Sequence, residues 1–211
     1  MAWLAIFGYV IFAALAFGAR SLVHYRRTGS TGFHGLSGRP GSIEWLGGAL
    51  FVVALVAGPA APILDLTGTL RPLGCAAVAL WRVCGVALYV AGVAGTLWAQ
   101  FAMGESWRIG VDSSECTRLV LKGPFQFVRN PIFTSMTAAL GGLALMVPNL
   151  AAGVALLALV AGLEIHVRVV EEPYLLRTHG EAYRRYLACT GRFLPRIGRK
   201  AAEGDTGARV S

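Results

Sequence analysis

The stretch PIFTSMTAALGGLALMVPNLAAGVALLALVAGLEI, residues 131–165, decides the fold of this 211-residue chain. Residues 132–163 carry no charged side chain, whereas about 20 apolar residues are enough for a helix to cross the hydrocarbon core of a bilayer. The run is therefore too long for one membrane helix, and the pair Pro148-Asn149 is a turn signal within it. The sequence predicts two membrane helices joined by a very tight turn.

Three further uncharged runs precede this hairpin. They cover Ala2–Ala19, Trp45–Leu64 and Val83–Met103, and the last of them follows the apolar stretch Leu73–Trp81 and a single Arg82. We expect Arg82 to mark the outer end of its helix, with its guanidinium among the lipid headgroups. The expected fold is an all-α integral membrane protein with five transmembrane helices, ending in a helical hairpin and a cytosolic or interfacial helix.

The positions of the basic residues test this topology independently. Of the 19 Lys and Arg residues, 4 lie in 20–44, 4 in 104–130 and 9 in 166–211, and Arg71 and Arg82 are the remaining two. Cytoplasmic loops carry an excess of Lys and Arg. We therefore expect a multi-pass protein of a bacterial-type inner or plasma membrane, with its N-terminus outside and its C-terminus in the cytosol. Four spans would put the first and last basic segments on opposite faces.

The composition excludes a water-soluble domain. The chain is 55% hydrophobic and 14% charged, with a mean hydropathy of +0.60, whereas soluble domains average about 45–50% apolar and about 25% charged residues. The net charge of +8 could indicate nucleic acid, but no nucleic-acid-binding motif is found in the sequence. Anionic lipid headgroups are the partner that this charge favours.

Two groups of small residues are expected to serve packing. The cysteines lie far apart without a C-x-x-C pair, so neither a metal site nor a disulfide framework is predicted; they are Cys75, Cys84, Cys116 and Cys189. Glycines inside the membrane runs are expected to let helices approach closely; they are Gly85, Gly92, Gly95, Gly141 and Gly142.

Polar residues gather in two segments near the inner membrane face. The first, residues 104–131, reads GESWRIGVDSSECTRLVLKGPFQFVRNP, in which Gly123-Pro124 predicts a turn and Pro131 suits the first turn of the next helix. Arg129 would then lie at the positive N-terminal end of that helix. There it would either dock an anionic group or extend to lipid headgroups.

The second polar segment, residues 162–186, reads GLEIHVRVVEEPYLLRTHGEAYRRY. If the last membrane helix continues through it, four charged residues share one helical face; they are Glu164, Arg168, Glu171 and Glu172. Glu164 and Arg168 have the spacing of an ion pair, which leaves Glu171 and Glu172 as a candidate ligand clamp. His166 points away from this face and is interpreted as a packing residue, without metal-ligand spacing to the other histidines.

A further amphipathic helix begins at Tyr174 and is interrupted at His179-Gly180. Aromatic and arginine side chains alternate toward its end, which is typical of a helix that lies in the membrane interface; they are Tyr183, Arg184, Arg185, Tyr186, Arg192 and Phe193. We interpret this helix as a membrane anchor.

The motifs of the two polar segments occur in the order GPF at 123–125, RNPIF at 129–133, Glu-Glu at 171–172, HGEAY at 179–183 and FLP at 193–195. This order resembles the isoprenylcysteine carboxyl methyltransferase family and its relatives among the membrane phospholipid and thiol methyltransferases. That family has a glycine-aromatic turn, Arg-His-Pro-x-Tyr at the start of a helical hairpin, a Glu-Glu pair, a tyrosine-rich helix and a closing proline.

The resemblance implies methyl transfer from S-adenosylmethionine to a lipophilic acceptor at the cytosolic membrane face, with S-adenosylhomocysteine as product. The acceptor group would be an isoprenylcysteine-type carboxylate, a thiol or a lipid headgroup. The residues that the resemblance places at the cofactor are Val120, Leu121, Gly123, Phe125, Arg129, Asn130, Pro131, Phe133, Glu171 and Glu172. Among them, Arg129 and Glu171 are the candidate catalytic residues.

Two positions depart from the family pattern, since Asn130 replaces the histidine and Phe133 the tyrosine. An amide forms hydrogen bonds but does not shuttle a proton near neutral pH, so a histidine base is not expected here. The alternatives are a non-catalytic membrane binding or scaffold protein of the same fold and an NADPH-dependent enzyme related to sterol reductases. We expect one domain over residues 1–200, with its catalytic part at about 104–195, and a disordered tail at 201–211.

Overall fold

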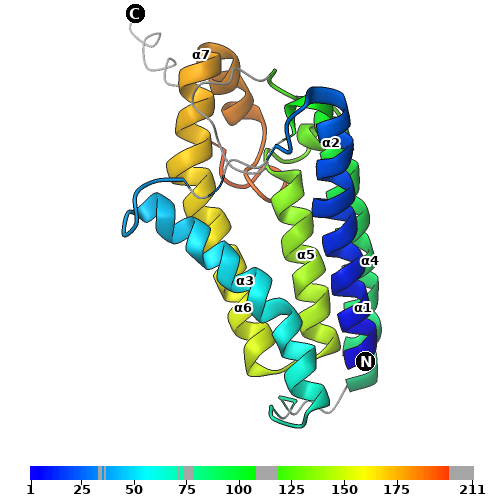
Figure 1. Ribbon diagram of the computed structural model, residues 1–211. Helices are drawn as coiled ribbons and strands as arrows, with labels where there is room; N and C mark the ends of the chain where they lie inside the picture. Colours follow the sequence, from blue (N-terminus) through cyan, green and yellow to red (C-terminus); the bar gives the residue numbers. More distant parts are fainter. Residues whose placement is uncertain (33–34, 36, 71, 74–77, 108–117, 200–211) are drawn as a thin grey trace, which may run out of the picture.

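The computed structural model describes residues 1–32, 35, 37–70, 72–73, 78–107 and 118–199. These residues form helices and one isolated β-bridge but no strand. The predicted tail at 201–211 lies outside the described residues, as do Cys75 and Cys116. The longer helical segments are drawn in Figure 1. The first combines α1 (Ala2–Ala13), the π-helix η1 (Ala14–Ala19) and α2 (Arg20–Thr28). Then follow α3 (Ile43–Leu66), α4 (Val78–Met103) and α5 (Pro131–Met146), and the last segment combines α6 (Leu150–Ile165), the π-helix η4 (His166–Glu171) and α7 (Glu172–Cys189).

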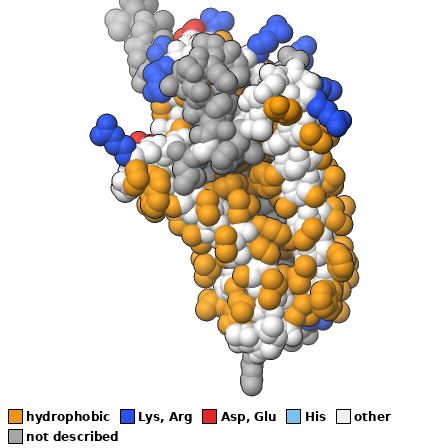
Figure 2. All heavy atoms as spheres, viewed as in Figure 1, with side chains coloured by type: hydrophobic (Ala, Val, Ile, Leu, Met, Phe, Trp, Pro, Cys, Tyr) orange, Lys and Arg blue, Asp and Glu red, His pale blue; other side chains and the backbone are white. Residues whose placement is uncertain are grey.

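Four of the helices in the described part of the chain are long and apolar enough to cross a membrane; they are Ala2–Thr28, Ile43–Leu66, Ala79–Met103 and Leu150–Cys189. Large apolar side chains cover the outside of the bundle, and Leu157 is 72% exposed. Figure 2 shows this apolar surface over most of one face, with most Lys and Arg side chains at the upper end. The prediction of an all-α, multi-pass integral membrane protein is confirmed, while the 16-residue α5 is shorter than these four helices.

The tight turn predicted at Pro148-Asn149 is present between α5 and α6. Asn149 is 1% exposed, and its Oδ1 caps α6 by accepting a hydrogen bond from the backbone N–H of Ala152 at 3.0 Å. The Nδ2 of Asn149 donates to the carbonyl of Ala61 in α3 at 2.8 Å. One side chain therefore ends the hairpin turn and fixes it against a neighbouring helix.

Two of the cysteines lie differently from the prediction, and Arg82 lies about one turn inside its helix. Because α4 begins at Val78, Arg82 follows the helix start by four residues and is still near the outer end. Cys84 and Cys189 are exposed free thiols, so the interpretation as packing residues is wrong for both. The uncharged run begins only at Val83, so it did not show that the helix starts earlier, at Val78.

Glycines hold α4 and α5 in close contact, as predicted. A Cβ atom on Gly92 would overlap the backbone nitrogen of Ala139, and one on Gly142 would overlap that of Tyr89. Both obstacles are main-chain atoms, which cannot move aside as a flexible side chain can. Small residues at these positions therefore set the distance between the two helices.

We expect Gly92→Ala to lower the stability of the protein by about 1–3 kcal/mol, because the added methyl group forces two packed helix backbones apart. The measurement is the thermal midpoint of the detergent-purified protein. Gly153→Ala in α6 is the matched control, since a Cβ there has no neighbour within 4 Å. An equal midpoint for the two variants would show that the close approach does not limit stability.

The helices form two packed pairs, α3 with α6 and α4 with α5, and α1 lies beside both α3 and α5. In Figure 1 the two pairs lie close together near the α5–α6 turn and diverge toward the end that carries α7. The N-terminus lies at the converging end. The diverging end is where the polar segments of the sequence come together.

Candidate active site

A cavity of about 420 Å³ occupies the diverging end of the bundle, between the two helix pairs. Its volume is within the range of about 300–1,000 Å³ that small-molecule sites occupy. Apolar side chains of α3 and α5 form much of the wall, among them Phe51, Leu55 and Met136. Seven predicted site residues also line it: Val120, Phe125, Arg129, Asn130, Pro131, Phe133 and Glu171.

Three of the predicted residues are not among the described residues that line the cavity. Leu121 is 41% exposed on the surface. Gly123 makes the predicted turn, with a left-handed φ of +64°, at the start of the short 3-10 helix η3 (Gly123–Gln126). Glu172 is 2% exposed and faces a buried cluster of charges instead. The cofactor prediction for these three positions finds no support in the geometry.

The buried charge cluster consists of Glu172, Arg129 and Arg192. Glu172 Oε1 accepts from Arg129 Nη2 at 2.9 Å and from Arg192 Nε at 2.7 Å, and its Oε2 accepts from Arg192 Nη2 at 3.0 Å. None of the three side chains is more than 8% exposed. The hydrogen bond to Glu172 raises the pKa of Arg192.

Glu171 and Glu172 thus lie in different surroundings, the first in the cavity wall and the second in the charge cluster. The π-helix η4 ends at Glu171, and its wider turn changes the angular position of the residues that follow. Glu164 and Arg168 form the predicted i,i+4 ion pair on the exposed side of this rod. Of the four charged residues expected on one face, Glu171 is the one that lines the cavity.

Arg129 does not take the headgroup role, because its side chain is 1% exposed. It lines the cavity and is also bound by protein acceptors. Besides Glu172 it donates to the carbonyls of Thr190, Leu187 at 3.4 Å and Gly198 at 3.1 Å. With both terminal nitrogens bound to protein acceptors, the guanidinium ties the start of α5 to the segment after α7.

The segment from Thr190 to Gly198, here called the C-terminal strap, is held along the start of α5. The backbone N–H of Arg129 donates to the carbonyl of Gly191 at 2.8 Å, and Thr134 Oγ1 donates to that of Phe193 at 2.8 Å. Asn130 donates to the carbonyl of Arg192 through both its backbone N–H and its side-chain Nδ2, at 3.1 and 3.2 Å. The amide that replaces the family histidine therefore anchors the strap. Pro131 follows as the first residue of α5, as predicted.

The sequence analysis did not include His166, Tyr183 or Tyr186 among the site residues, whereas the structure places all three in the cavity wall. The ring of His166 contacts that of Phe133 edge-on, with 6.1 Å between centroids. Tyr183 is 2% exposed, and the hydroxyl of Tyr186 donates to the carbonyl of Phe125 at 2.5 Å.

The helix α7 carries these tyrosines on its inner face. Arg184 and Arg185 point outward, with side chains 66% and 80% exposed, but Arg192 is buried, so the interfacial interpretation fails for it. The predicted interruption at Gly180 is present as a non-helical residue with φ of +51°. The i,i+3 spacing of Tyr183 and Tyr186 was the signal that could have shown one shared face.

The cavity suits a ligand that carries charges of both signs and an aromatic group. Its wall combines one carboxylate, Glu171, with the side chains of Arg118 and Arg129, polar amides and several aromatic rings among apolar residues. S-adenosylmethionine carries an ammonium, a sulfonium, a ribose diol and an adenine. A carboxylate accepts from the ammonium or the diol, and aromatic faces attract cations. The residues present therefore fit this group.

The fold defines a multi-pass membrane protein with a cavity of small-molecule size at one end of its helix bundle. Residues 80–182 match the family model described as phospholipid methyltransferase. This segment is a phospholipid methyltransferase family domain, and the isoprenylcysteine carboxyl methyltransferases belong to the same broader family. No curated protein matches the chain closely enough to count as a relative.

Members of this family are S-adenosylmethionine-dependent methyltransferases, and the family acts on acceptors of the lipid type. The protein is therefore a methyltransferase that uses S-adenosylmethionine, as the resemblance implied. The family match favours methyl transfer over both the reductase and the non-catalytic interpretation.

Proposed function

We propose that the cavity is the S-adenosylmethionine site and that a lipophilic acceptor is methylated inside it. The observation that carries this proposal is Glu171, a carboxylate in the wall of a largely apolar cavity. Asn130, Phe133, Tyr183 and Val120 complete the wall around it. In this proposal Glu171 contacts the cofactor, while Arg129 is a positioning residue that acts through the C-terminal strap.

The bound cofactor supplies an electrophilic methyl group on a sulfonium. The work of the protein is to exclude water and to hold the acceptor nucleophile in line with that methyl group. Apolar residues of α3, such as Phe51 and Leu55, line the cavity and would help to exclude water from it. Positioning of this kind supplies up to about 7–11 kcal/mol of the barrier lowering. A carboxylate or thiolate acceptor is already anionic and needs no base.

In the same proposal α5 is a fifth transmembrane helix, and the cavity opens toward the cytosol. Its 16 residues span about 24 Å at 1.5 Å per residue, and it packs between helices that are long enough to cross. Five crossings put the N-terminus at the end opposite to α7, where Figure 1 shows it. Most Lys and Arg side chains in the view of Figure 2 then lie on the cytosolic side.

Calorimetric titration of the purified protein with S-adenosylhomocysteine tests the proposed site. We expect saturable binding with one ligand per chain, and no binding of NADPH under the same conditions. The fold of the sample is checked by its thermal transition. NADPH binding without S-adenosylhomocysteine binding would contradict the proposal.

A further inference from the structure

The part of the cavity wall that α3 and α6 form consists of apolar and glycine residues up to the point where η4 begins. His166, the first residue of η4, follows them in the same wall. An ionisable side chain next to membrane-spanning apolar residues is costly, so a functional role is the default interpretation. The apolar and glycine residues of this wall are Gly47, Gly48, Phe51, Val52, Leu55, Gly162 and Leu163.

The π-helix η4 brings the imidazole of His166 and the carboxylate of Glu171 to the same cavity. The backbone hydrogen bonds of a π-helix join residues five positions apart, so one turn separates these two side chains. His166 is the one next to the apolar helix α6. In the proposed function Glu171 contacts the cofactor, which leaves His166 on the side where a lipophilic acceptor would lie.

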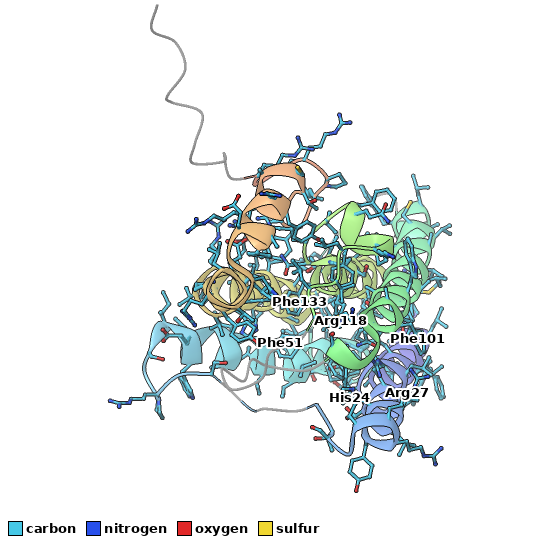
Figure 3. All side chains as sticks on the ribbon, turned by 90° about the horizontal axis from the view of Figure 1, so that it is seen from above. His24, Arg27, Phe51, Phe101, Arg118 and Phe133 are labelled. Carbon is cyan, nitrogen blue, oxygen red and sulfur yellow. The ribbon has the colours of Figure 1, made fainter. Side chains whose placement is uncertain are left out.

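Packing on two sides fixes the place of His166. Its ring meets Phe133 of α5 edge-on, with 6.1 Å between centroids. One turn earlier, a Cβ on Gly162 would lie 2.8 Å from the carbonyl oxygen of Gly47, so the backbones of α6 and α3 touch there. Seen from above, Figure 3 shows Phe133 and Phe51 toward the centre of the molecule, and both line the cavity. Support of this kind holds a reacting side chain in one geometry.

His166 is also one of few groups in the cavity that can act as a base. Of the described residues that line it, His166 and Glu171 are the two whose side chains can accept a proton near neutral pH. The guanidinium groups of Arg118 and Arg129 stay protonated, and tyrosine hydroxyls keep their protons at this pH. With Glu171 at the cofactor, the imidazole is the base that remains for the acceptor.

We propose that His166 takes the proton of an acceptor whose nucleophilic nitrogen or sulfur arrives protonated. The N–H or S–H bond breaks, and its proton goes to a ring nitrogen of His166. The electron pair that this leaves forms the bond to the methyl carbon. The old bond from that carbon to the sulfonium sulfur breaks, and its electron pair stays on the sulfur as the neutral thioether of S-adenosylhomocysteine. The imidazolium then gives its proton to water. This inference rests on the proposed function of the cavity.

Three amphiphiles with the same chain and different nucleophiles test this assignment. Dodecylamine, dodecanethiol and dodecanoic acid are supplied separately in phosphatidylcholine vesicles, whose quaternary headgroup offers no nucleophilic nitrogen. The measurement is the transfer of labelled methyl groups from S-adenosylmethionine to each amphiphile. We expect the amine or the thiol to be labelled, and the labelled one identifies the nucleophilic atom. Label in dodecanoic acid alone would overturn the proposal, because a carboxylate needs no base.

Variants assign the proton transfer to the imidazole. His166→Ala is expected to lower the rate at least about 100-fold, since a positioned base contributes about 10²–10⁴-fold. Imidazole added to the solution is expected to raise the rate of this variant about tenfold, because it can occupy the space of the missing ring. Calorimetry should show an affinity for S-adenosylhomocysteine within about twofold of that of the unaltered protein. His179→Ala is the control, since His179 is a half-buried histidine of the same helical segment and is not among the described cavity-lining residues.

The outcomes separate this inference from the proposed function. If S-adenosylhomocysteine binds but His166→Ala keeps the rate or gains nothing from imidazole, His166 is not the base and the cofactor site stands. The same holds if none of the three amphiphiles is labelled. Should His166→Ala fail to fold, His166→Gln takes its place, because it keeps the bulk but takes up no proton, and its rate must fall alike with the affinity retained. If S-adenosylhomocysteine does not bind to folded protein, the proposed function fails and the inference with it.

Discussion

Glu172→Gln is expected to lower the free energy of unfolding by about 3–5 kcal/mol, because the variant leaves two buried guanidinium groups without their carboxylate. Arg129 and Arg192 each contact Glu172 within 3.0 Å, and all three side chains are nearly inaccessible. Glutamine has the same shape, so the loss comes from the missing charge and not from a cavity. The measurement is the thermal midpoint or the denaturant midpoint of the purified protein.

Glu181→Gln is the matched control for this prediction. Glu181 lies on the same helix α7 and is also near two arginines, Arg184 at 3.8 Å and Arg185 at 3.5 Å, but its side chain is 62% exposed. Exposed ion pairs contribute little to the free energy of unfolding. The replacement of Glu181 should therefore change the stability by less than about 0.5 kcal/mol. Equal destabilisation by the two variants would refute the structural role that we assign to Glu172.

Glu171→Gln is expected to weaken binding of S-adenosylhomocysteine by about 10- to 100-fold while the protein stays folded. A hydrogen bond to a charged partner contributes about 1.5–3 kcal/mol, and each 1.4 kcal/mol is a factor of ten in affinity. The carboxylate lies in the cavity wall, so its loss acts on the ligand rather than on the charge cluster of the neighbouring Glu172. Calorimetric titration gives the affinity, and the thermal midpoint shows that the fold is kept.

Glu164→Gln serves as the control for Glu171→Gln. Glu164 is a carboxylate of the same helical rod, paired with Arg168 on the exposed side and not among the described residues that line the cavity. The affinity of the Glu164→Gln variant for S-adenosylhomocysteine should stay within about twofold of that of the unaltered protein. If both variants bind as the unaltered protein does, Glu171 is not a cofactor ligand.

The sequence predicted those features that depend on neighbours along the chain. Pro148-Asn149 ends one helix and caps the next, Gly123 supplies a left-handed turn, and Pro131 begins α5 because a missing N–H costs nothing there. Gly92 and Gly142 predicted a close contact between helices because they are small residues inside apolar runs. Local chemistry was sufficient for each of these.

The predictions that the structure does not bear out concern contacts between residues far apart in the sequence. Arg129 and Arg192 reach Glu172 from 43 and 20 residues away, so helical spacing could not separate Glu172 from Glu171. The π-helix η4 between Ile165 and Glu172 also breaks the 3.6-residue period on which the shared face was predicted. The same change of register explains why His166, expected to face away from the site, lines the cavity.

The central claim is that this cavity transfers a methyl group from S-adenosylmethionine to a lipid-type acceptor. The most direct measurement uses S-adenosylmethionine labelled in its methyl group, the purified protein in lipid vesicles, and counting of the label that partitions into organic solvent. We predict enzyme-dependent label in the organic phase, strongly reduced by Glu171→Gln and retained by Glu164→Gln. Folded protein that binds S-adenosylhomocysteine in the cavity but transfers no label to any lipophilic acceptor, or equal transfer by Glu171→Gln, would contradict this account.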